Sequence, residues 1–283
     1  MRGMEYADLD IRDESALEPF FVSEEWVAEQ KMDGTRAIVR LTATHIEFMH
    51  RSGEPLAHTA ARQWFDKIEQ ALLPLANAMG RGEEYIFDGE IIIANGEYRI
   101  FDLPSASIRS SGNGGVFPTH PYRWRRRMLD LLDIENDVIS IVKMATTEQE
   151  KRRLFEQVKE QGAEGLVLKR IDAPYLSGRV SKDVLKAKFV YTADVVVTTW
   201  NRPDEKHGSC QFAVYDNDGV LVTVGGCSLI GKPPVKEGDV IEVAYLYWTG
   251  ASVYQPRLMR VRDDKRAVDC SINQFKAYTR KVL

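Results

Sequence analysis

The chain has few cysteines, and they are scattered. Its 283 residues include three, at positions 210, 227 and 270, with no Cys-x-x-Cys pair among them. This pattern argues against a zinc site or a disulfide framework and is typical of reduced thiols inside a cell. No stretch approaches the roughly eighteen apolar residues that a membrane span needs, and the first fifteen residues contain no apolar run typical of a secretion signal. We therefore expect a cytoplasmic protein, either in its own cell or in the cytoplasm of a phage-infected host.

An excess of positive charge is also missing. Lys and Arg number 38 against 42 Asp and Glu, so the net charge is -4. Nucleic-acid binding would have to come from local basic patches, because the whole chain does not attract phosphate. Hydrophobic residues make up 44% and charged residues 28%, which is ordinary globular usage, and the length favours two domains.

The patterns along the chain change near Val190. Before it, strand-like runs alternate with two expected helices, one over 59–75 that stops at Pro74 and one over 147–161. Asn95-Gly96 predicts a hairpin between two strands. A Ser/Gly-rich loop is expected at 105–115, and the basic run 123–127 is either a solvated helix face or a contact for a nucleic-acid backbone. After Val190, short β-rich runs separated by turn residues predict a small barrel or sandwich.

Two short stretches in the first half place a charged residue beside a glycine. Lys31 precedes Asp33-Gly34, so its amine could lie at the lip of a pocket, although a surface hairpin with a solvated lysine is the alternative. Glu90 follows Asp88-Gly89, a predicted turn, and could accept hydrogen bonds from a ribose hydroxyl; it could equally be a glutamate on an edge strand without a function. Phe101 is either a core residue or a platform for a base.

Three further stretches follow. Glu164 precedes a buried-looking strand that has Lys169 at its far end, an arrangement that suits a metal at one rim and a phosphate at the other. Lys186 and Lys188 point to one face of a strand, where two cations repel unless an anion lies between them. Lysines that protect an exposed strand edge are the alternative. The segment 255–265 is basic and could touch a nucleic-acid backbone.

The order of these motifs resembles that of the covalent nucleotidyltransferases. Along the chain stand Lys-x-Asp-Gly-x-Arg, Asp-Gly-Glu, Phe-Asp, Glu-Gly-x-x-x-Lys, Leu-Lys-x-Lys and Arg-x-Arg-x-Asp-Lys. More closely, the chain from about Trp26 to Lys265 resembles the minimal ATP-dependent DNA ligases of viruses, bacteriophages and some bacteria. The segments 175–179 and Pro256-Arg257 favour that branch. The sequence His50-Arg51-Ser52-Gly53 departs from the Ser-Arg of many relatives, so only Arg51 carries over.

The resemblance implies an α+β fold in two domains. Residues 1–189 would form the adenylation (nucleotidyltransferase) domain, with antiparallel sheets and flanking helices, and residues 190–283 a small all-β OB-fold barrel. The implied activity seals 5′-phosphate/3′-hydroxyl nicks in duplex DNA through a lysyl-AMP and a DNA-adenylate. ATP and Mg²⁺ would be required, with Mn²⁺ able to substitute, and the enzyme would act on nicked duplex DNA as a monomer.

The same resemblance implies the site residues. The amine of Lys31 would attack ATP; because a free lysine, with a pKa of about 10.4, is mostly protonated at neutral pH, it must be activated by its surroundings. The implied catalytic residues are Lys31, Asp33, Arg36, Lys186 and Lys188. The implied nucleotide-binding residues are Glu29, Arg36, Arg51, Glu90, Phe101, Lys169, Lys186, Lys188, Arg262 and Lys265. The implied metal ligands are Glu164 and Glu90.

Alternatives remain at this point. An RNA ligase or a GTP-dependent RNA-capping guanylyltransferase would use the same lysyl-nucleotide chemistry. A non-catalytic OB-type nucleic-acid binder with decayed motifs belongs to a different class, and the intact lysine, acidic and basic positions in all six motifs argue against it.

Overall fold

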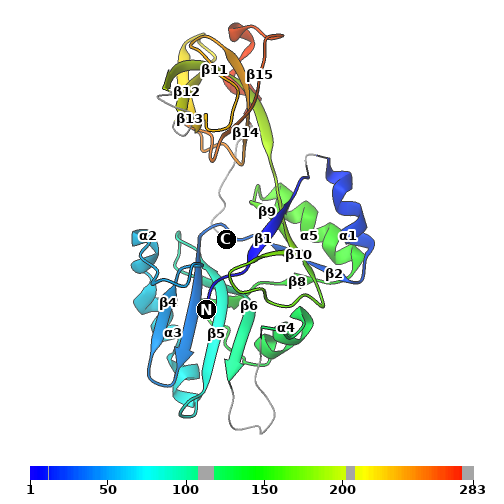
Figure 1. The fold of residues 1–283 in the computed structure, drawn as a ribbon, viewed down its shortest axis with the longest axis vertical. Coiled ribbons are helices and arrows are strands. Elements are labelled where there is room, and N and C mark those ends of the chain that lie inside the picture. The colour runs from blue at the N-terminus through cyan, green and yellow to red at the C-terminus, as the bar shows by residue number, and fades with distance from the viewer. Residues whose placement is uncertain (12, 108–117, 202–207, 276–283) are drawn as a thin grey trace. The chain divides into compact units, whose positions relative to one another are not determined.

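The computed structural model describes residues 1–11, 13–107, 118–201 and 208–275 (Figure 1). The chain divides into two compact units, Met1–Lys188 and the part that begins at Phe189. This division falls one residue before the boundary expected between 189 and 190. The assignment of the two parts to adenylation and OB domains stays a prediction. Residues 108–115 of the expected Ser/Gly loop lie outside the described residues.

The first unit contains two five-stranded sheets. In spatial order, the first sheet consists of β1 (Glu5–Leu9), β10 (Val180–Lys188), β9 (Gly165–Arg170), β2 (Trp26–Gln30) and β8 (Met144–Ala145). β1 runs parallel to β10, and the other pairs are antiparallel. The strands that carry Lys186, Lys188 and Lys169 therefore lie between the start of the chain and the strand that precedes Lys31.

The second sheet of this unit carries the other motifs. Its spatial order is β4 (Ile46–Met49), β3 (Thr35–Thr42), β5 (Glu84–Ile91), β6 (Tyr98–Ser107) and β7 (Ile139–Ile141). The predicted hairpin is confirmed: β5 and β6 pair antiparallel, and Gly96 has the positive φ of 73° that this connection needs. The turn expected at Asp88-Gly89 is wrong, because both residues lie inside β5. A Cβ at Gly89 would come within 2.7 Å of the Tyr98 ring, so this glycine serves close packing.

Helices flank the sheets. They are η1 (Glu14–Leu17), α1 (Glu18–Val22), α2 (Thr59–Arg62), α3 (Phe65–Ala78), α4 (Tyr122–Asp130) and α5 (Glu148–Glu160). The predicted second long helix is confirmed: Thr147 caps α5 and Gln161 ends it. The prediction of a single helix that stops at Pro74 is wrong. The helix is interrupted between α2 and α3, before Phe65, and α3 continues past Pro74. Buried Leu72 and Ala76 flank the proline, so packing sustains the last turn.

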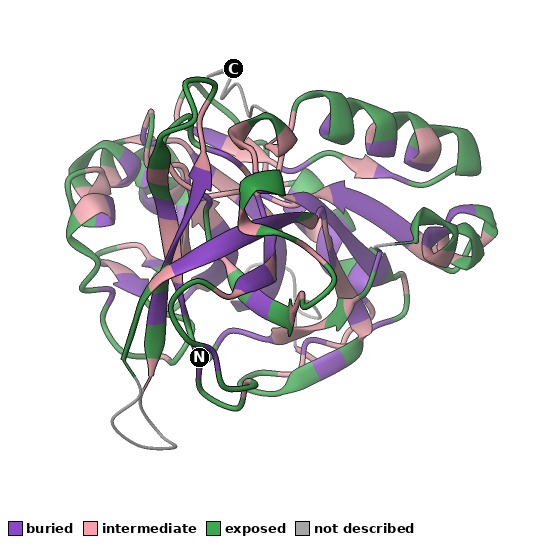
Figure 2. Cartoon of the chain, turned by 90° about the horizontal axis from the view of Figure 1, so that it is seen from above, coloured by how far each residue is buried: buried purple, intermediate pink, exposed green. Residues whose placement is uncertain are grey.

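Burial follows the strands, as Figure 2 shows, while the helices keep exposed outer faces. The main core of the first unit lies between the second sheet and α3, where Leu41, Phe87, Ile100 and Ile68 are almost fully buried. α5 packs against β2, β9 and α1. Among the described residues, no helix combines the length and the apolar character needed to cross a membrane.

The second unit is built on one five-stranded antiparallel sheet. Its spatial order is β13 (Leu221–Ser228), β12 (Ser209–Tyr215), β11 (Tyr191–Asn201), β14 (Val240–Tyr245) and β15 (Arg257–Val261), followed along the chain by η2 (Ala267–Asp269) and η3 (Ile272–Gln274). The predicted β-rich character is therefore confirmed. Closure into an OB barrel stays a prediction, because within the described residues no ladder joins β13 to β15.

Candidate active site

Lys31 stands where the chain passes from one sheet of the first unit to the other. β2 belongs to the first sheet and β3 to the second, so the segment between them is no surface hairpin. The backbone N–H of Lys31 donates to the carbonyl of Gly165 at 2.9 Å, which fixes the lysine at the end of β2. Gly34 passes so close to β5 that a Cβ there would lie 2.3 Å from the carbonyl oxygen of Ile91. The glycine of the motif thus brings the two sheets together beside the lysine.

The amine of Lys31 shares one carboxylate with a second lysine. Glu164 accepts from Lys31 Nζ at 2.7 Å and from Lys188 Nζ at 2.8 Å, one on each oxygen. The carboxylate is 9% exposed, and the two lysine side chains are 21% and 23% exposed. Two ammonium groups are therefore held together, partly out of water, in the manner of a phosphate-binding site.

Lys186 lies two residues before Lys188 on β10 and faces the same cavity. Its Nζ is 3.4 Å from Asp8 on β1, an acid that is 78% exposed. Such an exposed partner contributes little and can be exchanged for an incoming anion. The common face of these two lysines, predicted from their spacing, is what the structure has; neither of them protects a strand edge, because β10 lies between β1 and β9.

A cavity of about 460 Å³ opens beside these lysines. Most of the predicted site residues of the first unit line it, namely Glu29, Lys31, Arg36, Arg51, Glu90, Phe101, Lys169, Lys186 and Lys188. Its apolar lining includes Tyr6, Phe101 and Val167. Asp33 lies in the segment between β2 and β3. An aromatic wall beside several cations suits a ligand that has a flat ring and phosphates.

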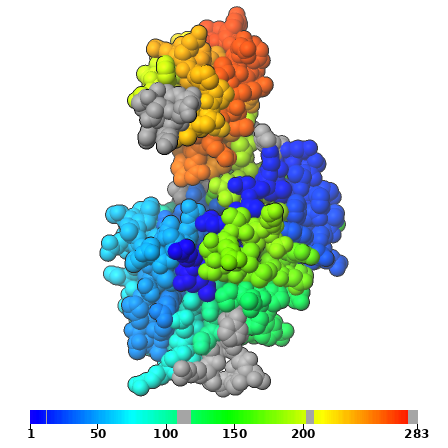
Figure 3. Space-filling model, viewed as in Figure 1, coloured from blue at the N-terminus to red at the C-terminus, as the bar shows by residue number. Residues whose placement is uncertain are grey.

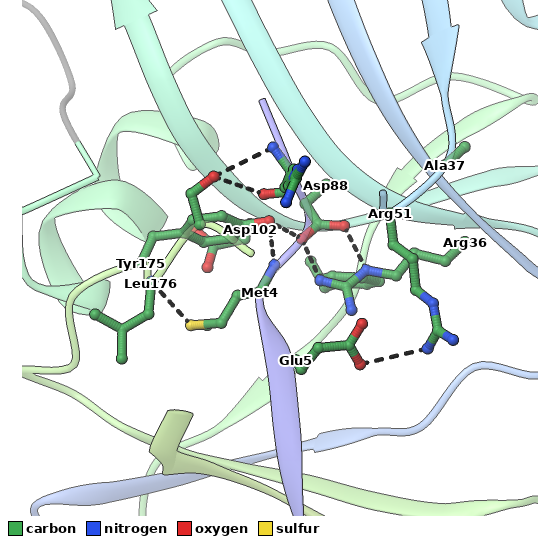
Figure 4. Close-up of polar contacts among 12 residues, drawn as sticks. Met4, Glu5, Arg36, Ala37, Arg51, Asp88, Asp102, Tyr175 and Leu176 are labelled. Atoms are coloured by element: carbon green, nitrogen blue, oxygen red, sulfur yellow. Dashed lines mark hydrogen bonds and ion pairs between the residues drawn. The ribbon is translucent and has the colours of Figure 1, made fainter. Parts of the chain in front are cut away.

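Arg36 is fixed by groups on several sides (Figure 4). Its guanidinium makes a two-pronged contact with Asp88, at 2.9 and 2.6 Å, and Tyr175 donates to the same carboxylate at 2.6 Å. The guanidinium also lies 4.9 Å from the ring centre of Tyr6 and 5.5 Å from that of Phe101. Asp88 and Tyr175 were not predicted as site residues, although both lie in stretches that the motifs include.

The floor of the cavity is a buried ion pair. Lys169 Nζ lies 2.7 Å from Glu29, and both side chains are at most 2% exposed. Lys169 also donates to the carbonyl of Phe101 at 2.8 Å, and the hydroxyl of Tyr122 donates to Glu29. These contacts hold the backbone of Phe101, and hence its ring, against β9. A direct contact of Lys169 with phosphate, as the resemblance implies, would have to break this buried pair.

Strand β1 supplies residues to the site that were not predicted from the sequence. In Figure 3 the first residues, in dark blue, lie between the yellow-green surface of β10 and the blue residues near 40–60. Glu5 and Tyr6 line the cavity, and Glu5 is 3.3 Å from Arg51. The hydroxyl of Tyr6 is buried without a hydrogen-bond partner in the described structure. Burial raises the pKa of this phenol well above its ordinary value, so the ring remains neutral.

The basic run 123–127 divides between the interior and the surface. Arg125 is buried and holds Asp102 through two 2.8 Å contacts, and Arg126 donates to the carbonyl of Val142 at 2.7 Å. Arg123 and Arg127 are exposed. Neither interpretation of the run as a whole, a solvated face or a backbone contact, therefore applies to its middle, because the period of α4 turns those two residues inward.

Glu90 faces the cavity from β5 and is largely desolvated. Burial raises its pKa to about 8, although the nearby Lys31 and Arg36 favour the charged form. At neutral pH the carboxyl is therefore mostly protonated and can donate as well as accept a hydrogen bond. Either role is compatible with a sugar hydroxyl.

This shifted pKa makes stability depend on pH. In the unfolded chain a glutamate titrates near ~4.3, so between the two pKa values the folded chain holds a proton that the unfolded chain has lost. The stability from this site is present at low pH and is lost as pH rises through about 8. We expect Glu90→Gln to reduce the loss of unfolding free energy between pH 5 and pH 8 by about 2–4 kcal/mol, measured by urea unfolding. Identical pH profiles for parent and variant would contradict this.

The carboxylates near the amine fit a metal that arrives with phosphates. Glu164 and Glu90 are close enough to interact electrostatically. Over the described ranges, however, no three His, Cys, Asp or Glu side chains gather to form a metal site. Mg²⁺ is commonly held by one or two carboxylates together with phosphate oxygens and water. Glu164 suits such a shared site, whereas Glu90 would have to lose its proton to join it. The role of both glutamates as ligands stays a prediction.

The two nucleotide-binding residues expected in the second unit, Arg262 and Lys265, are bound to an acid. Arg262 lies 2.9 Å from Asp194 Oδ1, and Lys265 contacts Oδ2 of the same carboxylate. Asp194 was not predicted as a site residue, since nothing in its strand-like context distinguishes it.

A family model described as RNA ligase matches residues 24–188, more than half of the chain. The chain belongs to this family. The match begins just before β2 and ends at Lys188, so it spans every predicted site residue of the first unit.

Curated relatives of this RNA ligase family member are named DNA ligases, which confirms the resemblance predicted from the motif order. DNA ligase C1 of Mycolicibacterium smegmatis is 23% identical, and the match covers 88% of each chain. A DNA ligase of Methanocorpusculum labreanum is 26% identical over 84% of this chain. The chain spans only 52% of that protein, and 33% of a DNA ligase of Archaeoglobus fulgidus.

Solved structures share the fold of this RNA ligase family member. A Lig E DNA ligase matches 93% of this chain and 100% of its own, with a TM-score of 0.61 and 20% identity. The ligase domain of LigD from M. tuberculosis matches 95% and 97%, with a TM-score of 0.51 and 19% identity. At these identities the likeness concerns the fold.

Proposed function

We propose that the protein is an ATP-dependent DNA ligase that seals 5′-phosphate/3′-hydroxyl nicks in duplex DNA. The observation that carries the proposal is the amine of Lys31, held with Lys188 on Glu164 at the mouth of an aromatic-walled cavity. The match with DNA ligase C1, which covers 88% of both chains, supports DNA as the substrate. In this proposal the first unit is the adenylation domain and the second an OB-fold domain, and the enzyme acts as a monomer.

The first step would be formation of lysyl-AMP. The ammonium of Lys31 loses a proton to solvent, and its nitrogen attacks the α-phosphorus of ATP. A P–N bond forms, the bond from the α-phosphorus to the bridging oxygen breaks, and pyrophosphate leaves with the electron pair. The nitrogen, positively charged after the attack, then loses a second proton to solvent and becomes the N–H of lysyl-AMP. The second ammonium, on Lys188, favours the neutral amine and stabilises the charge that develops on the phosphate. When ATP binds, its phosphate oxygens would replace the Glu164 carboxylate as the partners of both lysine amines.

The nucleoside would lie in the cavity below. Phe101 is expected to stack on the base, while Glu90 holds the ribose and Glu29 lies at the floor. Glu164 and Glu90 would hold Mg²⁺, or Mn²⁺ in its place, together with the phosphates. The ion would neutralise phosphate charge during transfer.

Two transfers to DNA would complete the reaction. The 5′-phosphate at the nick attacks the lysyl-AMP, which releases the amine and gives a DNA-adenylate. The 3′-hydroxyl then attacks that 5′-phosphate, and AMP leaves. Arg51, which is 55% exposed, and Lys186 lie at the open side of the cavity and would contact the 5′-phosphate. Arg36 and Asp33 would act near the terminal sugars.

A direct test combines nucleotide and nick dependence. The protein is incubated with labelled ATP or GTP and Mg²⁺, and then with a nicked DNA duplex or a nicked RNA duplex. We expect a covalent adduct with ATP and sealing of the DNA nick. Preferential sealing of RNA would favour an RNA ligase, the candidate that the matched family model supports. An adduct with GTP alone would favour a capping guanylyltransferase, and no adduct with either nucleotide would overturn the proposal.

The motifs should separate by reaction step. Arg262 and Lys265 are proposed to hold the β- and γ-phosphates, which are gone once AMP is on the enzyme or on DNA. We expect Lys265→Ala to fail with ATP and yet to seal a nick that already carries 5′-AMP at near-parent rates. Glu164→Ala should seal both substrates slowly, because Glu164 contacts Lys31 and Lys188 in the catalytic site. Equal loss by Lys265→Ala on the two substrates would contradict the assignment of Lys265 to pyrophosphate.

A further inference from the structure

One buried carboxylate holds both cations of the second unit. Asp194 lies on β11, and its side chain is 11% exposed. Its Oδ1 accepts from Arg262 Nη1 at 2.9 Å, and its Oδ2 accepts from Lys265 Nζ. Each oxygen thus takes one cation, so the carboxylate sets the distance between the two positive groups. It also offsets their mutual repulsion, which a bare pair would experience in this partly buried place.

Asp194 is fixed more firmly than the cations it holds. It lies inside a ladder, opposite Glu242 of β14. Its backbone N–H donates to the side chain of Gln274 at 2.8 Å, and its carbonyl accepts from the same side chain at 2.8 Å. Arg262 and Lys265 follow the end of β15, where the chain leaves the sheet. The carboxylate is therefore the rigid reference, and the two long side chains are aimed by it.

The other carboxylate on Arg262 differs in kind. Asp264 takes the Nε and Nη2 edge of the guanidinium at 2.8 and 2.9 Å, but it is 65% exposed. An exposed pair of this type is weak and readily exchanged in water. Removing the buried partner instead would leave cations with no fixed acceptor. Incoming phosphate can therefore replace Asp264 on the Nε and Nη2 edge of Arg262 while Asp194 keeps its contact with Nη1.

We infer that Asp194 is a positioning residue for the leaving group of the adenylation step. It aims Arg262 and Lys265 at the pyrophosphate that departs when the bond between the α-phosphorus and the bridging oxygen breaks. Asp194 itself touches no substrate. The inference rests on the proposed function, in which these two cations hold the β- and γ-phosphates. It predicts that loss of the carboxylate harms the step that releases pyrophosphate and spares the two steps that do not.

Asp194→Asn tests this inference, because it keeps the size of the side chain and removes its charge. We expect single-turnover formation of enzyme-AMP at saturating ATP to fall about 10–100-fold, as for a misplaced transition-state contact. Sealing of a nick that already carries 5′-AMP should stay within about twofold of the parent, which also reports that the variant is folded. Asp269→Asn is the control: it removes a carboxylate of the same C-terminal segment that is 39% exposed and forms its ion pair with Arg266. Asp269 acts on Lys265 only electrostatically and from an exposed position, so this variant should change either rate far less than Asp194→Asn does.

Several outcomes would overturn the inference. Equal loss on ATP and on the pre-adenylated nick would indicate a merely structural role, and parent-like adenylation would show that the cations need no aiming. A double variant, Asp194→Asn with Lys265→Ala, should lose less than the product of the single losses, because Asp194 acts in part through Lys265. Fully multiplicative losses would contradict that. If the parent itself formed no adduct, the proposed function would fail instead, so the two failures are distinguishable.

Discussion

Lys31→Ala is expected to abolish the covalent enzyme-AMP adduct and all sealing that starts from ATP. The side chain is 21% exposed, and Glu164 keeps its 2.8 Å contact with Lys188 after the change, so the fold should persist. Among the described residues that line the cavity, Lys31 is the one lysine at the end of β2. Intact-mass measurement after incubation with ATP and Mg²⁺ would give the adduct, and peptide mapping would locate it on Lys31 in the parent.

Two further variants sharpen this test. Lys31→Arg keeps the positive charge beside Glu164 but cannot lose a proton to become a nucleophile, so it should also form no adduct. Lys182→Ala removes an exposed lysine from β10 and should behave as the parent does. An adduct that maps to Lys169 or Lys186, or one that survives in Lys31→Arg, would refute the assignment of the nucleophile.

The largest loss of stability is expected from Arg125→Met. The guanidinium is 1% exposed, holds Asp102 through two 2.8 Å contacts and donates to the carbonyls of His120 and Ala173. Although burial disfavours its charged form, Arg125 holds the pKa of Asp102 below its ordinary value. Without the arginine an unpaired carboxylate stays in the interior, which typically costs about 3–5 kcal/mol. Urea unfolding followed by circular dichroism would measure the change.

The control lies on the same helix. Arg127 is exposed, so Arg127→Met should change the unfolding free energy by no more than about 0.5 kcal/mol. The double variant Arg125→Met, Asp102→Leu removes both charges and should recover part of the loss. A double variant no more stable than Arg125→Met would show that the lost carbonyl contacts, and not the stranded carboxylate, dominate the cost.

The sequence predicts which residues meet at this cavity better than it predicts the contacts that hold them there. Lys31, Glu90, Phe101 and the two lysines of β10 stand in short motifs whose spacing carries over directly to one cavity. The partners that fix these residues are not identified by such motifs. Asp88 lies in a stretch that reads as a turn, yet it is a buried strand residue that holds Arg36, because only the pairing of β5 with β3 brings the two together.

Two other features depend on packing that no local pattern contains. The run 123–127 reads as a uniformly basic face, and only the position of α4 against β6 decides that Arg125 turns inward. The interruption between α2 and α3 and the continuation of α3 past Pro74 likewise depend on the core beneath the helix. Local propensity is a weak guide wherever tertiary contacts are strong.

The pairing of β1 with β10 has a consequence for how the protein is made. Glu5 and Val180 lie opposite each other in this parallel pair, so β1 leaves the ribosome well before the strand that it joins. At ordinary rates of translation, about 5–20 residues per second, β1 waits roughly 10–35 s for its partner. Until then Tyr6 and Glu5 have no place in a sheet, and the wall they form beside Arg36 is missing. Under the proposed function, nucleotide would therefore stabilise the nascent chain only after β10 has emerged, and completion of the cavity would be a late event in folding.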